Sequence, residues 1–224
     1  MSAKKINKLT NSNQSMKHIL LLVLISFVAV SASAQKKFTF GPKAGFTVAN
    51  LHVDDDDQND QISGVKAGLV IGAFAEYRAV KWFAVSADVL FARKGAQNEF
   101  KESTSGFDRE TENNFKLNYI DVPVLANFYV AKGFAIKAGI QPSFLLSAKN
   151  KVSQKTNGEL KKETVDFKKE LNKVDFAIPV GISYSFKMGL VLDLRYHIAC
   201  TDLLKDGDYK LTNQVASLTV GWKF

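Results

Sequence analysis

The stretch from Leu190 to Ile198 reads LVLDLRYHI and alternates between two kinds of residue. One set is apolar or aromatic: Leu190, Leu192, Leu194, Tyr196 and Ile198. The other set is mostly ionic: Val191, Asp193, Arg195 and His197. A helix would scatter these charges around its axis, whereas a β-strand places one set on each face. Two surroundings suit such a strand: a soluble sandwich with its charges facing water, and a membrane-spanning barrel with its apolar row facing lipid.

A secretory signal peptide is predicted over residues 1–34. A short basic segment precedes the apolar run Ile19–Val30, and the small residues that follow predict cleavage between Ala34 and Gln35. The run is shorter than the about 20 apolar residues that a membrane helix needs. Met16 is an alternative start, because the segment from there already contains every part of a signal peptide.

Charge and cysteine content narrow the class of protein. Removing residues 1–34 takes away four lysines and no acids, which lowers the formal charge from +8 to +4. This ordinary value, together with export, argues against a nucleic-acid partner. Cys200 is the only cysteine, so no internal disulfide can form, and no cysteine stands directly after the cleavage site to carry a lipid anchor.

Eight strands are predicted in the mature chain, residues 35–224, from their two-residue alternation. They lie at 38–50, 64–78, 82–95, 115–130, 134–148, 173–187, 190–201 and 212–224. Each reaches the about 9–11 residues that a tilted strand needs to cross a bilayer, whereas strands of soluble proteins are usually about 5–6 residues long.

The connections between these strands alternate in length. Short ones fall at 79–81, 131–133 and 188–189, and long polar ones at 51–63, 96–114, 149–172 and 202–211. Short turns on one rim and long loops on the other are typical of outer-membrane barrels. The predicted fold is therefore all-β: an eight-stranded antiparallel up-and-down transmembrane β-barrel.

The charged rows of these strands are predicted to face the lumen. They contain Lys43, Lys66, Glu76, Arg78, Asp88, Asp121, Lys137, Asp175, Lys187, Asp193, Arg195 and His197. The interior of an eight-stranded barrel is just wide enough for side chains to fill. These carboxylates and cations are therefore expected to pair into a network.

Several segments resemble a known family in their order and spacing. They are FGPKAGFTVANL (40–51), LNYIDVPVLANFYV (117–130), VDFAIPVGISYSF (174–186) and LVLDLRYHIACTDL (190–203). They are similar to the porin-like, PorT-type outer-membrane β-barrel domain family of Bacteroidetes-type bacteria. The resemblance implies a bacterial outer-membrane location and little about activity. It also implies that the terminal Phe224 is an assembly signal read by the barrel-assembly machinery.

One group of residues could suggest catalysis. Asp193 and His197 share a strand face, and Ser183 and Ser185 lie on the preceding strand. A serine–histidine–aspartate triad needs its members within hydrogen-bond reach, and no nucleophile elbow is present. A structural network in the lumen is the favoured interpretation, with no catalytic residue.

Two polar segments could suggest ligands. The acids Asp54–Asp57 and Asp60 could hold calcium, but they lack the spaced pattern and turn glycine of such sites, so a solvated loop is favoured. The lysine-rich segment 149–172 could contact lipopolysaccharide, although a mobile polar loop is favoured. No metal site, cofactor site or nucleotide-binding motif is predicted.

The sequence favours a non-enzymatic barrel that has a structural or binding role through its long extracellular loops. Its expected partners are outer-membrane lipid, lipopolysaccharide and, during biogenesis, the barrel-assembly machinery; the partner of the loops stays open. The alternatives are a narrow porin-like channel, an accessory factor in outer-membrane protein secretion, an outer-membrane enzyme and a soluble lipocalin-like barrel.

Overall fold

The computed structural model describes residues 37–54, 65–104, 107–156, 159–204 and 210–224. The predicted signal peptide and its cleavage site at Ala34 and Gln35 lie outside these residues. None of the described residues forms a helix long and apolar enough to cross a membrane.

The described residues form eleven strands joined by turns and short irregular segments. The strands are β1 (Phe38–Asp54), β2 (Lys66–Val80), β3 (Phe83–Lys94), β4 (Gln97–Thr104), β5 (Phe107–Asp121), β6 (Val124–Ala131), β7 (Phe134–Thr156), β8 (Glu159–Asp166), β9 (Val174–Ser185), β10 (Leu190–Ala199) and β11 (Lys210–Trp222).

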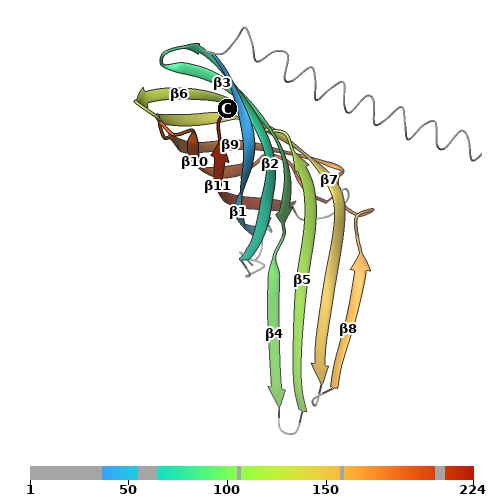
Figure 1. Ribbon diagram of the computed structural model, residues 1–224. Helices are drawn as coiled ribbons and strands as arrows, with labels where there is room; N and C mark the ends of the chain where they lie inside the picture. The colour runs from blue at the N-terminus through green and yellow to red at the C-terminus, as the bar shows by residue number, and fades with distance from the viewer. Residues whose placement is uncertain (1–36, 55–64, 105–106, 157–158, 205–209) are drawn as a thin grey trace, which may run out of the picture. The chain divides into compact units, whose positions relative to one another are not determined.

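The sheet closes on itself into an eight-membered ring. Its hydrogen-bonded order runs from β2 through β1, β11, β10, β9, β7 and β6 to β3, and a β2–β3 pairing completes the circuit. Strands β5 and β6 share one position, because both lie between β3 and β7. The described residues thus confirm the predicted all-β antiparallel barrel (Figure 1).

A proline interrupts the strand between β3 and β7 and divides it into β5 and β6. Pro123 has no N–H to donate to a ladder, so the strand is interrupted there. Hydrogen bonds beside it keep the sheet continuous: Asp88 N donates to Pro123 O at 3.0 Å, and Val122 N donates to Pro142 O at 2.9 Å.

The two faces of the barrel wall differ as the sequence predicts. On β10, Leu192 and Leu194 point outward and are 38% and 48% exposed, whereas Asp193 and Arg195 point inward and are 1% and 3% exposed. The same inversion holds around the ring, where large apolar side chains cover the outside and most buried polar side chains face the lumen. An exposed apolar surface of this extent suits lipid rather than water.

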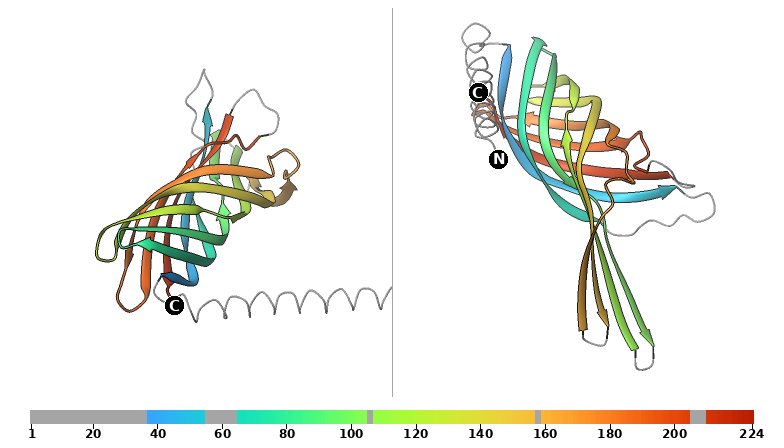
Figure 2. Two further views of the ribbon diagram at one scale, coloured as in Figure 1. Left: turned by 90° about the horizontal axis from the view of Figure 1, so that it is seen from above. Right: turned by 90° about the vertical axis from the view of Figure 1, so that its right-hand side faces the viewer.

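Two predicted loops are in fact strands, which corrects the sequence analysis. The 96–114 connection contains β4 and half of β5, and the 149–172 connection contains the end of β7 and β8. Pairing of β5 with β7 continues from Asp121↔Ser143 to Arg109↔Thr156, far past the ring. The four strands β4, β5, β7 and β8 form a sheet extension (Figures 1 and 2).

The other end of the ring carries the three short turns, and we call it the short-turn end. Two of these turns contain a glycine with a positive φ: Gly133 at 79° and Gly189 at 99°. Glycine adopts this left-handed conformation without the steric cost that other residues meet. These glycines therefore allow tight reversals between β6 and β7 and between β9 and β10.

Candidate functional site

An ionic cluster around Asp193 fills the middle of the lumen. Arg195 donates two hydrogen bonds to this carboxylate: Nε lies 2.7 Å from Oδ1 and Nη2 lies 2.6 Å from Oδ2. Lys137 Nζ donates to Oδ2 at 2.8 Å, and Lys43 Nζ donates to the same oxygen at 3.2 Å. Three cations from three strands thus converge on one carboxylate.

Asp88 is the second carboxylate of this cluster. Its Oδ2 lies 2.9 Å from Lys43 Nζ and 2.7 Å from Arg195 Nη1. The five charged side chains come from β1, β3, β7 and β10, and each is at most 6% exposed. Ion pairs across the lumen therefore connect strands that are not neighbours in the sheet.

A second group surrounds Glu76 toward the short-turn end. Tyr129 donates its hydroxyl to both carboxylate oxygens at 2.8 and 2.9 Å, and Lys223 Nζ lies 3.0 Å from Oε1. Arg78 Nη2 lies 3.5 Å from the same carboxylate, and its guanidinium lies over the Tyr129 ring at 3.6 Å. Asn127 adds a longer hydrogen bond to Glu76 at 3.3 Å.

A third group lies toward the end with the sheet extension. Lys94 Nζ donates to Asp121 Oδ1 at 2.9 Å and lies over the ring of Tyr119 at 4.8 Å. Asp175 accepts a hydrogen bond from the Thr201 hydroxyl. These groups continue the polar filling of the lumen beyond the central cluster.

An apolar cluster covers this third group, and sequence reasoning did not predict it. Leu171 and Leu203 come from the connections after β8 and β10 and are each 1% exposed. They pack with inward residues of the ring, including Leu117, Tyr119 and Leu145. We call these residues the apolar cap. The cap is held by an isolated bridge between residues 171 and 204, by a backbone hydrogen bond from Asn172 N to Leu203 O, and by the Asn172 side-chain amide, which donates to the carbonyls of residues 202 and 204.

The structure places most of the predicted lumenal charges inside the ring. Lys66 is half-buried at the extension end, where its Nζ donates to Asn114 Oδ1 at 2.6 Å and to the carbonyl of Phe115. Lys187 is an exception, because β9 ends at Ser185 and the exposed Lys187 lies in the turn that follows. The strand alternation that placed it in the lumen has already stopped there.

Sequence reasoning omitted two charged members of the lumenal groups, Lys94 and Lys223. Both occupy inward rows, since Lys94 follows Asp88 at even spacing and Lys223 follows Thr219 in the same way. The signal was therefore present in the two-residue period, at the last residue of β3 and at the residue directly after β11.

The described geometry does not assemble a catalytic triad. His197 Nε2 lies 3.0 Å from Ser217 Oγ, and His197 Nδ1 has no hydrogen-bond partner within the described residues. Ser183 instead faces Asp193 across the β9–β10 pairing, and that carboxylate is held by three cations. A triad needs a carboxylate on the second ring nitrogen to orient the histidine.

The acidic segment falls largely outside what the structure describes. The side chains of Asp54–Asp57 and Asp60 are not among the described residues. Elsewhere in the described ranges, no three histidine, cysteine or acidic side chains gather as a metal-ligand group.

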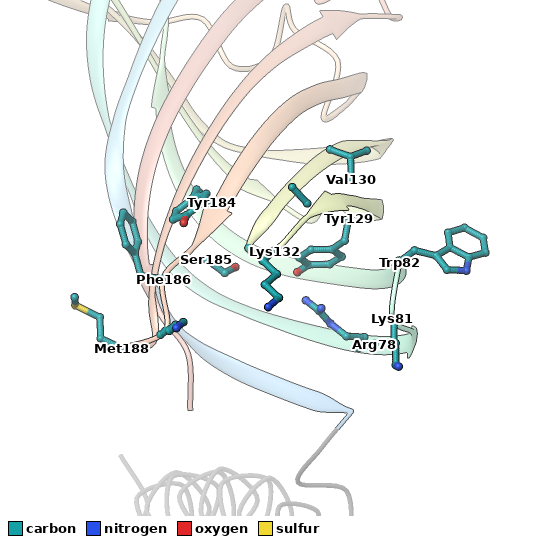
Figure 3. Close-up of a pocket in the computed structure, with 13 residues that line it drawn as sticks. Arg78, Lys81, Trp82, Tyr129, Val130, Lys132, Tyr184, Ser185, Phe186 and Met188 are labelled. Carbon is teal, nitrogen blue, oxygen red and sulfur yellow. The ribbon is translucent and has the colours of Figure 1, made fainter.

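A pocket of about 890 Å³ opens at the short-turn end. Arg78 and Tyr129 form its floor, and the surrounding turns contribute Lys81, Lys132 and Lys187 (Figure 3). We call this pocket the short-turn mouth. It combines cationic side chains with an apolar and aromatic wall.

A closed ring with an apolar outside and an ionic inside defines the class of integral β-barrel membrane proteins. The family comparison agrees: residues 31–205 match the model of the outer membrane protein beta-barrel domain, and the chain belongs to this family. The protein is therefore located in the bacterial outer membrane.

Solved structures of outer-membrane barrels are similar to this chain. Ail of Yersinia pestis, in complex with the heparin analogue sucrose octasulfate, is 14% identical with a TM-score of 0.47, over 84% of this chain and 99% of that one. Neisserial surface protein A is 18% identical with a TM-score of 0.41, over 84% and 97%. The comparison with curated proteins gave no match.

Proposed function

We propose that this chain is a non-enzymatic outer-membrane protein that binds lipopolysaccharide phosphates at the base of its sheet extension. The observation that carries the proposal is a pair of lysines facing each other there. Lys116 on β5 and Lys149 on β7 are direct cross-strand partners, and both are exposed on the outward face. Directly opposed like charges destabilise a sheet, so a bound anion would relieve their repulsion.

The position of these lysines relative to the apolar surface supports the proposal. On β7, the outward residues Phe144 and Leu146 are 44% and 46% exposed and belong to the apolar belt, and Lys149 and Lys151 follow on the same face. The cations therefore begin where the apolar belt ends. Long loops mark the extracellular rim of such barrels, which is the level of lipopolysaccharide phosphates.

Arg93 extends this cationic row onto β3. It is exposed, it occupies the outward row of its strand, and it pairs in register with Asn118 on β5. Within the described residues, no ion pair involves Arg93, Lys116, Lys149 or Lys151. Asp166 on β8 is the other register partner of Lys149 and offsets part of its charge, whereas the register partners of Lys116 and Arg93 are Lys149 and Asn118, so their charges remain available to an external anion.

The filled lumen argues against the alternative of a channel. The central cluster, the Glu76 group and the apolar cap occupy successive levels of the interior. An ion would have to displace buried ion pairs and then pass an apolar constriction. We expect no single-channel steps in planar bilayers, and stable conductance would favour the porin-like reading.

The resemblance to PorT-type barrels suggests a second candidate function, an accessory role in outer-membrane protein secretion. The sheet extension would serve it as well, because β4 and β8 each pair with a single strand in the described part of the chain. Such edges can accept another strand. Secretion that is unchanged in a deletion strain would argue against this role.

The lipopolysaccharide proposal is tested with the double variant Lys116→Gln/Lys149→Gln. Binding of fluorescent lipopolysaccharide to the refolded protein should weaken about tenfold or more, because each cation near an anionic surface contributes about 1 kcal/mol. Dephosphorylated lipopolysaccharide should not distinguish the variant from the parent protein.

The matched control is Lys155→Gln/Lys162→Gln, which removes the same charge farther along the same sheet. In register, Lys155 lies six residues beyond Lys149, and Lys162 lies on the neighbouring strand β8. If both double variants weakened lipopolysaccharide binding equally, only the net charge would matter, and the proposed site would be wrong.

A further inference from the structure

The short-turn mouth gathers positive charge from segments far apart in sequence. Its lining contains four cations, Arg78, Lys81, Lys132 and Lys187, and no acidic residue. Each of the three lysines comes from a different short turn, and in Figure 3 Arg78 lies between Lys132 and Lys81. Turns need no lysine for their geometry, so the repeated choice of lysine calls for another explanation.

Neighbouring carboxylates leave most of this charge uncompensated. Glu76, beside the floor of the mouth, already accepts hydrogen bonds from Tyr129 and Lys223 and lies 3.5 Å from Arg78. Within the described residues, no ion pair involves Lys81, Lys132 or Lys187. An anion entering the mouth would meet cations without displacing an internal partner.

The wall of the mouth is apolar and open. Trp82, Val130 and Met188 lie at its rim and are 61%, 62% and 66% exposed, and Figure 3 shows Trp82 and Met188 pointing away from Arg78, toward the outside of the barrel. Tyr184 and Phe186 add further aromatic rings to the lining. A small, fully hydrated anion would gain little from this wall, whereas an anion with an acyl chain would cover it.

The level of the mouth matches that of lipid headgroups. Trp82 stacks with Phe128 at a centroid distance of 6.4 Å, and both are exposed on the outer surface. Aromatic side chains mark the membrane–water interface, and lysines beyond them extend toward phosphates. Short turns face the periplasm in barrels of this kind, so the adjacent leaflet is the inner one.

We propose that the short-turn mouth binds the phosphate headgroup of an anionic phospholipid from the inner leaflet. Lys81, Lys132 and Lys187 contact the phosphate, and the apolar wall holds the upper part of an acyl chain. This site lies at the opposite end from the proposed lipopolysaccharide site and does not depend on it.

The two tryptophans of the chain allow a direct test, because only Trp82 lines the mouth. A Trp222→Phe protein is reconstituted in bilayers that mix phosphatidylcholine and phosphatidylglycerol, with bromine on the chains of one lipid at a time. Quenching of Trp82 fluorescence reports which lipid lies beside it. We expect a preference for phosphatidylglycerol of about fivefold or more, since a single lysine near an anionic surface already contributes about 1 kcal/mol.

Neutralising the mouth should remove this preference. In the Lys81→Gln/Lys132→Gln/Lys187→Gln variant, both brominated lipids should quench Trp82 equally. The control Lys155→Gln/Lys161→Gln/Lys162→Gln removes three lysines from the sheet extension and should keep the preference. Heat-modifiable gel mobility, measured on both variants, confirms that each barrel is folded.

Three results would overturn the proposal. The first is equal quenching by the two lipids in the parent protein. The second is loss of the preference in the control as well as in the mouth variant. The third is a saturable change of Trp82 emission with inorganic pyrophosphate in pure phosphatidylcholine, without any lipid preference, which would assign the mouth to a soluble anion.

Discussion

At the scale of single residues, Asp193 is the side chain on which the lumen depends most. It accepts hydrogen bonds from Arg195, Lys137 and Lys43, and it is 1% exposed. Burying a charge is costly unless it is paired and hydrogen-bonded. Here the carboxylate and the three cations satisfy one another, so loss of one member leaves the others buried and unmatched.

Asp193→Asn should therefore destabilise the folded barrel strongly. It would leave three buried cations with Asp88 as the remaining carboxylate of the cluster. Breaking a buried pair from one side costs about 3–5 kcal/mol, and urea unfolding in lipid vesicles would measure the loss. Glu163→Gln on the exposed strand β8 is the control, with an expected change within about 0.5 kcal/mol. Similar losses in both variants would show that the network does not stabilise the barrel.

An outward residue on the ring should be sensitive to charge for a different reason. Leu194 lies in the middle of β10 and is 48% exposed, so Leu194→Arg would place a cation in lipid at a cost of about 2–4 kcal/mol. Leu160→Arg makes the same change on β8, in the sheet extension, where Leu160 is 57% exposed. Folding yield in vesicles should fall for the first variant alone; equal yields would mean that Leu194 does not face lipid.

At the scale of elements, the sequence predicted the ring strands because each has an apolar row at two-residue spacing. Strands β4 and β8 were missed because their rows are polar on both faces. In β8, for example, Lys161 and Glu163 lie on one face and Lys162 and Thr164 on the other. Backbone pairing with β7 makes this segment a strand, and residues 159–166 carry no apolar period that could predict such pairing.

The apolar cap was missed for a related reason. Leu171 and Leu203 lie 32 residues apart in connections without alternation. Their meeting over Tyr119 depends on how two loops fold back into the ring. The lumenal groups were easier to predict, because strand alternation alone places Asp88, Asp193 and Arg195 inside.

The part of the sheet extension formed by β4 and β5 should be dispensable for folding of the ring. Asn98 and Asn113 are register partners, so residues 99–112 can be replaced by an Asn-Gly turn that suits a two-residue hairpin. Pairing of β5 with β3 begins at Leu117 and remains intact. The shortened protein should show unchanged heat-modifiable mobility in detergent, whereas failure to refold would show that the extension helps to assemble the barrel.

At the scale of the whole molecule, the barrel reverses the usual distribution of apolar and charged side chains between the surface and the interior of a protein. Apolar side chains cover its outside, paired ions and an apolar cap fill its inside, and ring closure leaves no strand edge to lipid within the ring. Different side chains occupy its two ends. The extension end presents opposed lysines on a sheet, and the short-turn end presents lysines around a pocket.

Spin labels at alternating positions test this inversion most directly. In a Cys200→Ser background, cysteines replace Leu192 and Leu194 on the outer face and Ser217 on the inner face, and each is labelled in reconstituted vesicles. The account predicts that oxygen, which concentrates in lipid, relaxes the labels at 192 and 194, and that neither oxygen nor a water-soluble nickel complex reaches the label at 217. Labels at 192 and 194 that respond to the nickel complex more than to oxygen would contradict it.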